Sequence, residues 1–341
     1  MTSLARSADA SDTTEFTFVE RESYEAGFAE VYQRLIVPYL RDLEARRKRV
    51  ILRSQRIILI IALVALFLAW QAYRLDPILP IMPIAFGAFG ALFVYLSRGD
   101  KLRDELTTFI RPVLSDFLHD VSFAEKTTAE EFRLNTLERL CLVPKADRRT
   151  LGPRISGSWR GVSYTLTKAR FAEEYRDDDN KSRTRTLFNG ILIEVECWNP
   201  MPTIVYLPDF GELGNKVYSW ATRNVRPPHR LDLSDDDLER TFEVYTDDPE
   251  QAQKELDTDF GRKILHMSED LQGVEAHMPA AFEGHSFFMA VRLPHGFLNF
   301  NVMDRPMSEV DEKIHQAFRD LTIPRRIIDR LLDWPHAETL T

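Results

Sequence analysis

The sequence contains only two cysteines in 341 residues, Cys141 and Cys197, which lie far apart and form no Cys-x-x-Cys pair. This scarcity excludes a disulfide framework and a cysteine-ligated zinc site, and it fits a reducing compartment. The formal net charge of −9 argues against a general nucleic-acid binder, because neutralising phosphates requires a basic face. Residues 1–14 lack the apolar core of a secretory signal. We expect residues 1–19 to be a disordered tail and residues 333–341 to be a second tail.

The sequence also lacks the common catalytic and nucleotide-binding motifs. It contains no GxxxxGK[ST] loop, no GxGxxG after a strand and no GxSxG elbow. The acidic run Asp177–Asn180 departs from a calcium loop at its next positions, where Lys181 and Ser182 replace a ligand and the turn glycine. We therefore expect no metal site and no cofactor, and we interpret the acidic run as a solvated hairpin turn.

Charge is absent from two long apolar runs, residues 57–73 and 77–97, which charged residues bracket. About 20 helical residues cross a bilayer core, with roughly 17 at the short end. Only Arg74, Leu75 and Asp76 separate the runs, so the two spans must be antiparallel. Small residues let helices approach closely in lipid, and the predicted packing residues are Ala62, Ala65, Ala69, Ala72, Gly87 and Ala91. The sequence predicts a transmembrane hairpin over residues 57–97.

Basic residues concentrate on both outer flanks of this hairpin, whereas the connecting turn has one arginine. By the positive-inside rule, both termini are cytoplasmic and the turn lies outside. The same flanks would contact anionic headgroups. The predicted membrane-surface residues are Arg46, Arg47, Lys48, Arg49, Arg53, Arg56, Arg98 and Lys101.

Apolar residues recur at helical spacing on both sides of the hairpin, which predicts a juxtamembrane helix over residues 20–56 and a helical connector over residues 98–150. Pro38 should kink the first helix. In the connector, Thr128 and Glu131 have the spacing of a capping box before a helix over residues 130–141. The two flanking helices either pair as a stalk or pack separately on the soluble domain, and the sequence favours neither alternative.

Residues 151–332 alternate between strand and helix patterns and predict a cytoplasmic α+β domain with a mainly antiparallel sheet and a C-terminal helix. Residues 148–153 resemble a linker or a turn. Asp248, Pro249 and Gln251 mark a helix start, and Ser308 with Asp311 marks the last helix. Strands are predicted near residues 155–167, 187–198, 203–207, 242–245, 274–277, 287–293 and 297–302.

The chain resembles a bacterial membrane-protein family that is known only as a domain of unknown function. The similar segments are YQRLIVPYL (Tyr32–Leu40), FNGILIEVE (Phe188–Glu196) and FEVYTDDPEQAQKELDTDF (Phe242–Phe260). The resemblance covers roughly residues 20–330 and implies a multi-pass protein of the bacterial cytoplasmic (inner) membrane. It implies no catalytic residues.

The remaining candidates for chemistry are two carboxylates and the histidines of nearby strands. Glu194 and Glu196 share one face of a strand because they are two residues apart, and His277 and His285 could join them in a pocket, beside His295. A polar outer face explains the same residues without any site. We expect a membrane-anchored binding or scaffolding module that engages a protein partner or lipid headgroups. The alternative is a membrane-bound enzyme with an unrecognised site, and the small-residue spans could also form a homo-oligomer.

Overall fold

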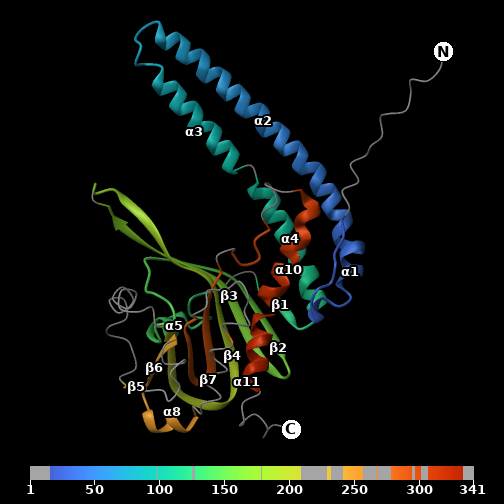
Figure 1. Ribbon diagram of the computed structural model, residues 1–341, viewed down its shortest axis with the longest axis vertical. Helices are drawn as coiled ribbons and strands as arrows, with labels where there is room; N and C mark the ends of the chain where they lie inside the picture. Colours follow the sequence, from blue (N-terminus) through green and yellow to red (C-terminus); the bar gives the residue numbers. More distant parts are fainter. Residues whose placement is uncertain are drawn as a thin grey trace, which may run out of the picture. The chain divides into compact units, whose positions relative to one another are not determined.

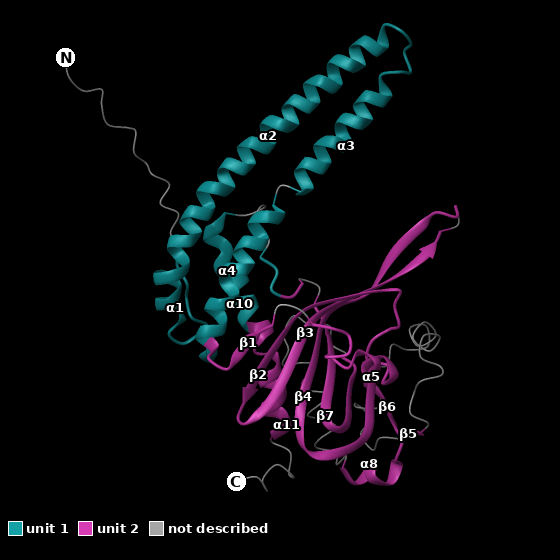
Figure 2. Ribbon diagram, turned by 180° about the vertical axis from the view of Figure 1, so that it is seen from behind, with its two compact units in different colours: residues 1–117, 298–318 teal, residues 118–297, 319–341 magenta. Residues whose placement is uncertain are grey.

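The computed structural model describes residues 16–97, 99–124, 127–177, 179–208, 229–231, 241–255, 267, 278–293, 296–300 and 306–332. The chain divides into two compact units (Figure 2). Unit 1 comprises residues 1–117 and 298–318, and unit 2 comprises residues 118–297 and 319–341. The fold class is α+β, as predicted: N-terminal helices, two of which are apolar, precede an antiparallel sheet and a C-terminal helix.

The first half of unit 1 leads into one long helix (Figure 1). A short 3-10 turn (Ser23–Glu25), α1 (Phe28–Val31) and a π-helical turn (Tyr32–Ile36) precede α2 (Val37–Tyr73). The π-helical turn stands immediately before Pro38, where the sequence predicts a kink. Proline lacks an amide donor and clashes with the carbonyl four residues earlier, and the wider turn accommodates both effects.

Side chains of α2 and of α4 (Asp100–Leu118) meet in unit 1. The Tyr39 and Phe109 rings stack with centroids 3.8 Å apart. Arg46 Nη1 donates to Glu105 Oε1 at 2.7 Å. Leu106 and Ile110, at the centre of the apolar stripe of α4, are fully buried. These contacts show that the two flanking helices pair with each other within unit 1, and we call this pair the helical stalk.

A buried polar pair holds the N-terminal segment of unit 1 against α10 (Val310–Leu321). His315 Nδ1 lies 2.7 Å from Glu25 Oε1, and both side chains are about 1% exposed. The Glu25 carboxylate also accepts the Arg21 amide at 2.7 Å. Phe18 stacks on the His315 ring with centroids 4.2 Å apart. Burying the Glu25 carboxylate is tolerated because each of its oxygens has a donor.

The second apolar helix, α3 (Ile81–Ser97), returns alongside α2 to form a hairpin (Figure 1). Both helices are long and apolar enough to cross a membrane. Helix α3 begins four residues later than the predicted span. Residues 77–80 form a turn instead, since Pro77 and Pro80 cannot donate backbone hydrogen bonds.

Small residues line the contact between the two apolar helices. A Cβ added to Gly87 would lie 2.5 Å from the Ala65 Cβ, so the backbones approach as closely as glycine allows. Ala69 is buried, and Ala72 and Ala91 are half-buried, whereas Ala62 is exposed. Ile61 takes that place on the contact face, with its side chain 3.8 Å from the Cβ position of Gly90.

Unit 2 is built on an antiparallel sheet. Its described strands are β1 (Val121–Phe123), β2 (Arg148–Trp159), β3 (Val162–Arg176), β4 (Ser182–Pro208), β5 (His229–Leu231), β6 (Phe242–Thr246) and β7 (Ala280–Arg292). The order is β1-β2-β3-β4-β6-β5, and β7 pairs with β4. The far ends of β3 and β4 extend as a two-stranded ribbon (Figure 1). The described helices of this unit are α5 (Leu134–Arg139), α8 (Pro249–Glu255) and α11 (Ile323–Leu332).

The sequence predicted some of the elements of unit 2 correctly and others wrongly. Asp248 caps α8 as predicted, with its carboxylate accepting the Gln251 amide at 3.0 Å. Strand β2 begins at Arg148, within the segment interpreted as a linker. Residues 297–298 form a turn and residues 299–300 have no regular secondary structure, so the strand predicted over 297–302 is wrong for these residues. The strand predicted over 274–277 lies outside the described residues.

Candidate functional site

Helix α5 places two arginines beside the centre of the sheet. Its residues Leu134 and Leu137, with Leu140 just beyond, recur every third position and are buried in one core with Leu192 and Phe288. The capping box that the sequence predicts is formed just before it, at Thr128 and Glu131. The helix itself spans only Leu134–Arg139, which is shorter than predicted. Because the leucines fix the helix, Arg133 and Arg139 at its two ends have defined positions.

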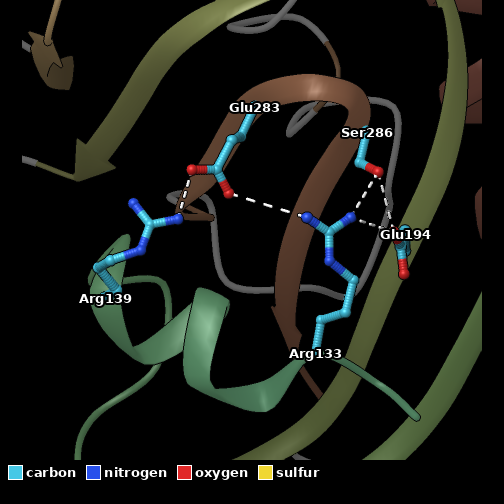
Figure 3. Close-up of polar contacts among 5 residues, drawn as sticks. All are labelled: Arg133, Arg139, Glu194, Glu283 and Ser286. Carbon is cyan, nitrogen blue, oxygen red and sulfur yellow. Dashed lines mark hydrogen bonds and ion pairs between the residues drawn. The ribbon is translucent and has the colours of Figure 1, made fainter. Parts of the chain in front are cut away.

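Arg133 is the centre of the polar cluster in Figure 3. Its Nη1 donates to Glu194 Oε1 at 3.0 Å and to Ser286 Oγ at 2.9 Å. The Ser286 hydroxyl in turn donates to Glu194 Oε1 at 2.9 Å. The guanidinium also lies over the Phe288 ring, with its carbon 4.9 Å from the ring centroid, a cation–π geometry. These contacts join α5 to β4 and β7.

A second carboxylate links the two arginines (Figure 3). Glu283 of β7 forms an ion pair with Arg139 through Oε1, and its Oε2 lies 3.9 Å from Arg133 Nη2. Gly284, the next residue, has a left-handed φ of +59° at a register shift between β4 and β7. This irregularity turns Glu283 toward the helix, and glycine adopts such a backbone without a Cβ penalty.

The two arginines and two glutamates of the cluster have no formal net charge, but the arginines are more exposed to solvent than the glutamates. The carboxylates Glu194 and Glu283 are 21% and 24% exposed, whereas Arg133 and Arg139 are 42% and 49% exposed. Solvent and any ligand therefore meet guanidinium groups first. Guanidinium is suited to bind carboxylate or phosphate oxygens through several donors. The cluster presents a small positive surface on unit 2.

The structure brings some of the predicted pocket residues into this cluster and leaves others outside it. Glu194 belongs to it, while Glu196, two residues along β4, is exposed. His285 is exposed, and its Nδ1 lies 3.1 Å from the Cys197 carbonyl oxygen. His277 lies outside the described residues. In the part of the chain that the structure describes, no three His, Cys, Asp or Glu residues are grouped to hold a metal ion.

Sequence reasoning missed four members of the cluster: Arg133, Arg139, Glu283 and Ser286. Ser286 lies opposite Glu196 in the ladder and diagonal to Glu194, so their contact depends on the register of two bulged strands. Arg133 has a left-handed backbone (φ 49°), which no local pattern in the sequence indicates for an arginine. A reliable strand register would have been needed to find these residues.

The predicted membrane-surface residues all belong to unit 1, and of these Arg98 lies outside the described residues. Lys48, Arg49, Arg53, Arg56 and Lys101 are exposed, and Arg46 and Arg47 are partly covered.

Comparison with known proteins gives one match. Residues 186–332, less than half of the chain, match the family model described as "Protein of unknown function (DUF3137)". This range includes Glu194, Glu283 and Ser286 but neither arginine of the cluster. No curated protein and no solved structure matches the chain. Over residues 186–332, the chain is thus similar to an uncharacterised family, a domain of unknown function, as the sequence resemblance implied.

Proposed function

We propose that the chain is a membrane-anchored binding module, in which α2 and α3 cross a bilayer and unit 2 binds a protein partner in the cytoplasm. The exposure of the apolar hairpin is the main support. Helix α3 buries none of its residues, and large apolar side chains such as Phe86 and Phe89 are 71% exposed. Apolar surface in water is unfavourable by roughly 25 cal/mol per Å², and a patch of this extent requires a covering surface.

The ends of the hairpin support a bilayer as that covering surface. Trp70 and Tyr73 stand at the turn end of α2, where interfacial aromatics are expected. The Arg74 guanidinium lies 4.0 Å from the Trp70 ring centroid, and Asp76 accepts the Ile78 amide at 2.8 Å. The turn is therefore polar, while the helices on either side of it are apolar. With basic flanks at the other end, the proposed orientation places both termini in the cytoplasm of a bacterial cell.

We expect the full chain, expressed in bacteria, to stay in the membrane pellet after a carbonate wash at high pH. In a Cys141→Ala, Cys197→Ala background, a Leu75→Cys variant should react with a membrane-impermeant maleimide in intact cells. A Lys181→Cys variant should react only after lysis, because its exposed hairpin turn would be cytoplasmic. Extraction of the chain by carbonate would contradict the anchor, and the reverse labelling pattern would contradict the orientation.

For the binding surface we propose the guanidinium face of the cluster, with an acidic segment of the partner as its ligand. Arg139 supports this assignment because it is half-exposed and pairs with Glu283 through one nitrogen. Its other donors are available to a carboxylate of a partner. Such charged contacts set specificity and association rate as well as affinity.

Replacing Arg139 with alanine should reduce capture of the partner about tenfold when the full chain is crosslinked in native membranes and purified in mild detergent. The matched control is Arg139→Lys, which keeps the charge and should retain most of the capture. Thermal unfolding of both variants shows whether unit 2 is intact. Equal capture by wild type and by a folded Arg139→Ala variant would contradict this surface.

One contact favours the alternative of a membrane-bound enzyme. The Ser286 hydroxyl donates to Glu194 at 2.9 Å, which is the geometry of a nucleophile beside a base. Ser286 is 8% exposed, however, and its oxygen also accepts a hydrogen bond from Arg133. The hydroxyl is thereby held inside the cluster, which favours binding over catalysis. Covalent labelling of Ser286 by a fluorophosphonate would reverse this preference.

A further inference from the structure

The basic residues that precede the first apolar span have two different environments in unit 1. Arg46 forms ion pairs with Asp42 Oδ2 at 2.6 Å and with Glu105 Oε1 at 2.7 Å. Arg47 is 11% exposed and donates to both oxygens of Glu44 at 2.7 and 2.9 Å. The pKa of Glu44 would be raised by burial, but the hydrogen bonds and charge of Arg47 outweigh this and lower it. These two arginines stabilise the helical stalk.

Arg49, Arg53 and Arg56 have a different environment on α2. They are exposed, and α2 contains no Asp or Glu after Glu44. Within the described residues none of the three forms an ion pair, and Arg49 Nε donates only to the Ala45 carbonyl oxygen at 3.3 Å. Their positive charges are therefore uncompensated by the described part of the protein.

The neighbouring helix α4 does not supply the missing acids. Asp100 and Asp104, in its first turns, both pair with Arg103, at 3.4 and 3.3 Å. Glu105 pairs with Arg46. Each of these three acids already pairs with an arginine, so among the described residues α4 supplies no counter-charge to the three free arginines, and an external anion can supply it.

The three free arginines also have the spacing of a single site along α2. Intervals of four and three residues place them on one face of the helix. From Arg49 to Arg56 the helix rises about 10 Å, which spans one headgroup layer of roughly 5–7 Å and the water just outside it. Ile57, the first residue of the apolar span, follows immediately. The stripe thus ends at the boundary where lipid phosphates would lie.

We propose that Arg49, Arg53 and Arg56 bind the phosphates of anionic glycerophospholipids, and that Arg46 and Arg47 do not. This inference rests on the proposed membrane anchor. Arg49, Arg53 and Arg56 thus bind lipid, whereas Arg46 and Arg47 stabilise the protein. Guanidinium binds phosphate oxygens through several donors at once, and the long side chains can reach toward the headgroups from an exposed helix face.

The test is native mass spectrometry of the full chain in detergent, with equal amounts of phosphatidylglycerol and phosphatidylcholine added at low ionic strength. For the triple variant Arg49→Gln, Arg53→Gln, Arg56→Gln we expect the ratio of bound phosphatidylglycerol to phosphatidylcholine to fall about tenfold or more. The double variant Arg46→Gln, Arg47→Gln should keep the wild-type ratio and unfold at a lower temperature. A triple lysine variant, which keeps the charges, should retain most of the preference.

An unchanged lipid ratio in the triple glutamine variant would overturn the proposal. An equal fall in the double variant would also overturn it, because total charge, and not position, would then determine binding. Free inorganic phosphate as a competitor should not remove the preference, and if it does, the site binds phosphate ions and not lipid. Each variant is also tested for retention in the membrane pellet after the carbonate wash. Loss of retention means that the membrane anchor has failed, whereas retention with an unexpected lipid ratio contradicts only the lipid-binding proposal.

Discussion

Replacing Gly190 with alanine is expected to lower the free energy of unfolding by about 3 kcal/mol or more, and to be among the most destabilising single-methyl additions in the chain. Gly190 lies in β4, opposite Arg292 of β7. An added Cβ would lie 2.0 Å from the Val291 carbonyl oxygen and 2.9 Å from the Arg292 Cα. Both are backbone atoms, so the side chain cannot avoid them by changing rotamer. The two strands must separate, and the pairing at the centre of the sheet is lost.

The control for the Gly190→Ala variant is Gly152→Ala in β2. There an added Cβ would meet the Lys168 Cβ at 3.0 Å, and a side-chain atom can move by a few tenths of an ångström. Denaturant unfolding of the full chain in detergent, followed by tryptophan fluorescence, measures both variants. If Gly190→Ala lowers the free energy of unfolding no more than Gly152→Ala does, β4 and β7 are not packed as described.

Cys197 in the native protein is expected to react with iodoacetamide at pH 8 about a thousandfold more slowly than an unperturbed thiol. Burial, with a smaller contribution from the charge of Glu196, raises the pKa of Cys197 from 9.0 to about 12. The thiolate is the reactive form, and each unit of pKa increase lowers its population tenfold at a pH below both values. The rate should therefore rise about tenfold per pH unit through the range in which the protein stays folded.

A Cys141→Ala variant isolates this reaction, and mass spectrometry of the alkylated protein follows it. The denatured chain supplies the rate of an unperturbed thiol. Replacing Glu196 with glutamine removes the neighbouring negative charge and should increase the native rate by a few-fold only, because burial is the larger cause. Native alkylation at the denatured rate would show that Cys197 is not in the environment described.

The sequence was sufficient for features that local residues determine. Residues 57–97 contain only two charges, Arg74 and Asp76, both in the connecting turn, and this pattern predicts two antiparallel apolar helices. Asp248 and Gln251 form a cap whose two partners are three residues apart, so no tertiary information is needed. The start of β2 at Arg148 could not be predicted in this way, because pairing with β3 and not local preference makes this segment a strand.

The polar cluster could not be predicted from the sequence, for a different reason. Glu194 was selected from its spacing with Glu196, but its actual partners are Arg133, 61 residues before it, and Ser286, 92 residues after it. These contacts depend on bulges in the β4–β7 ladder and on the left-handed backbone at Arg133. Each of these is fixed by packing of the whole sheet, which a linear pattern does not contain.

The continuity of α2 has a mechanical consequence. Its 37 residues form a rod of about 55 Å, of which a bilayer core would enclose only the apolar part. The remaining length, about 30 Å from Val37 to Ile57, joins the helical core of unit 1 without a break. A bilayer of different thickness changes the tilt of a spanning helix. In the proposed membrane anchor, the continuous rod would transmit that change in tilt directly to the base of unit 1.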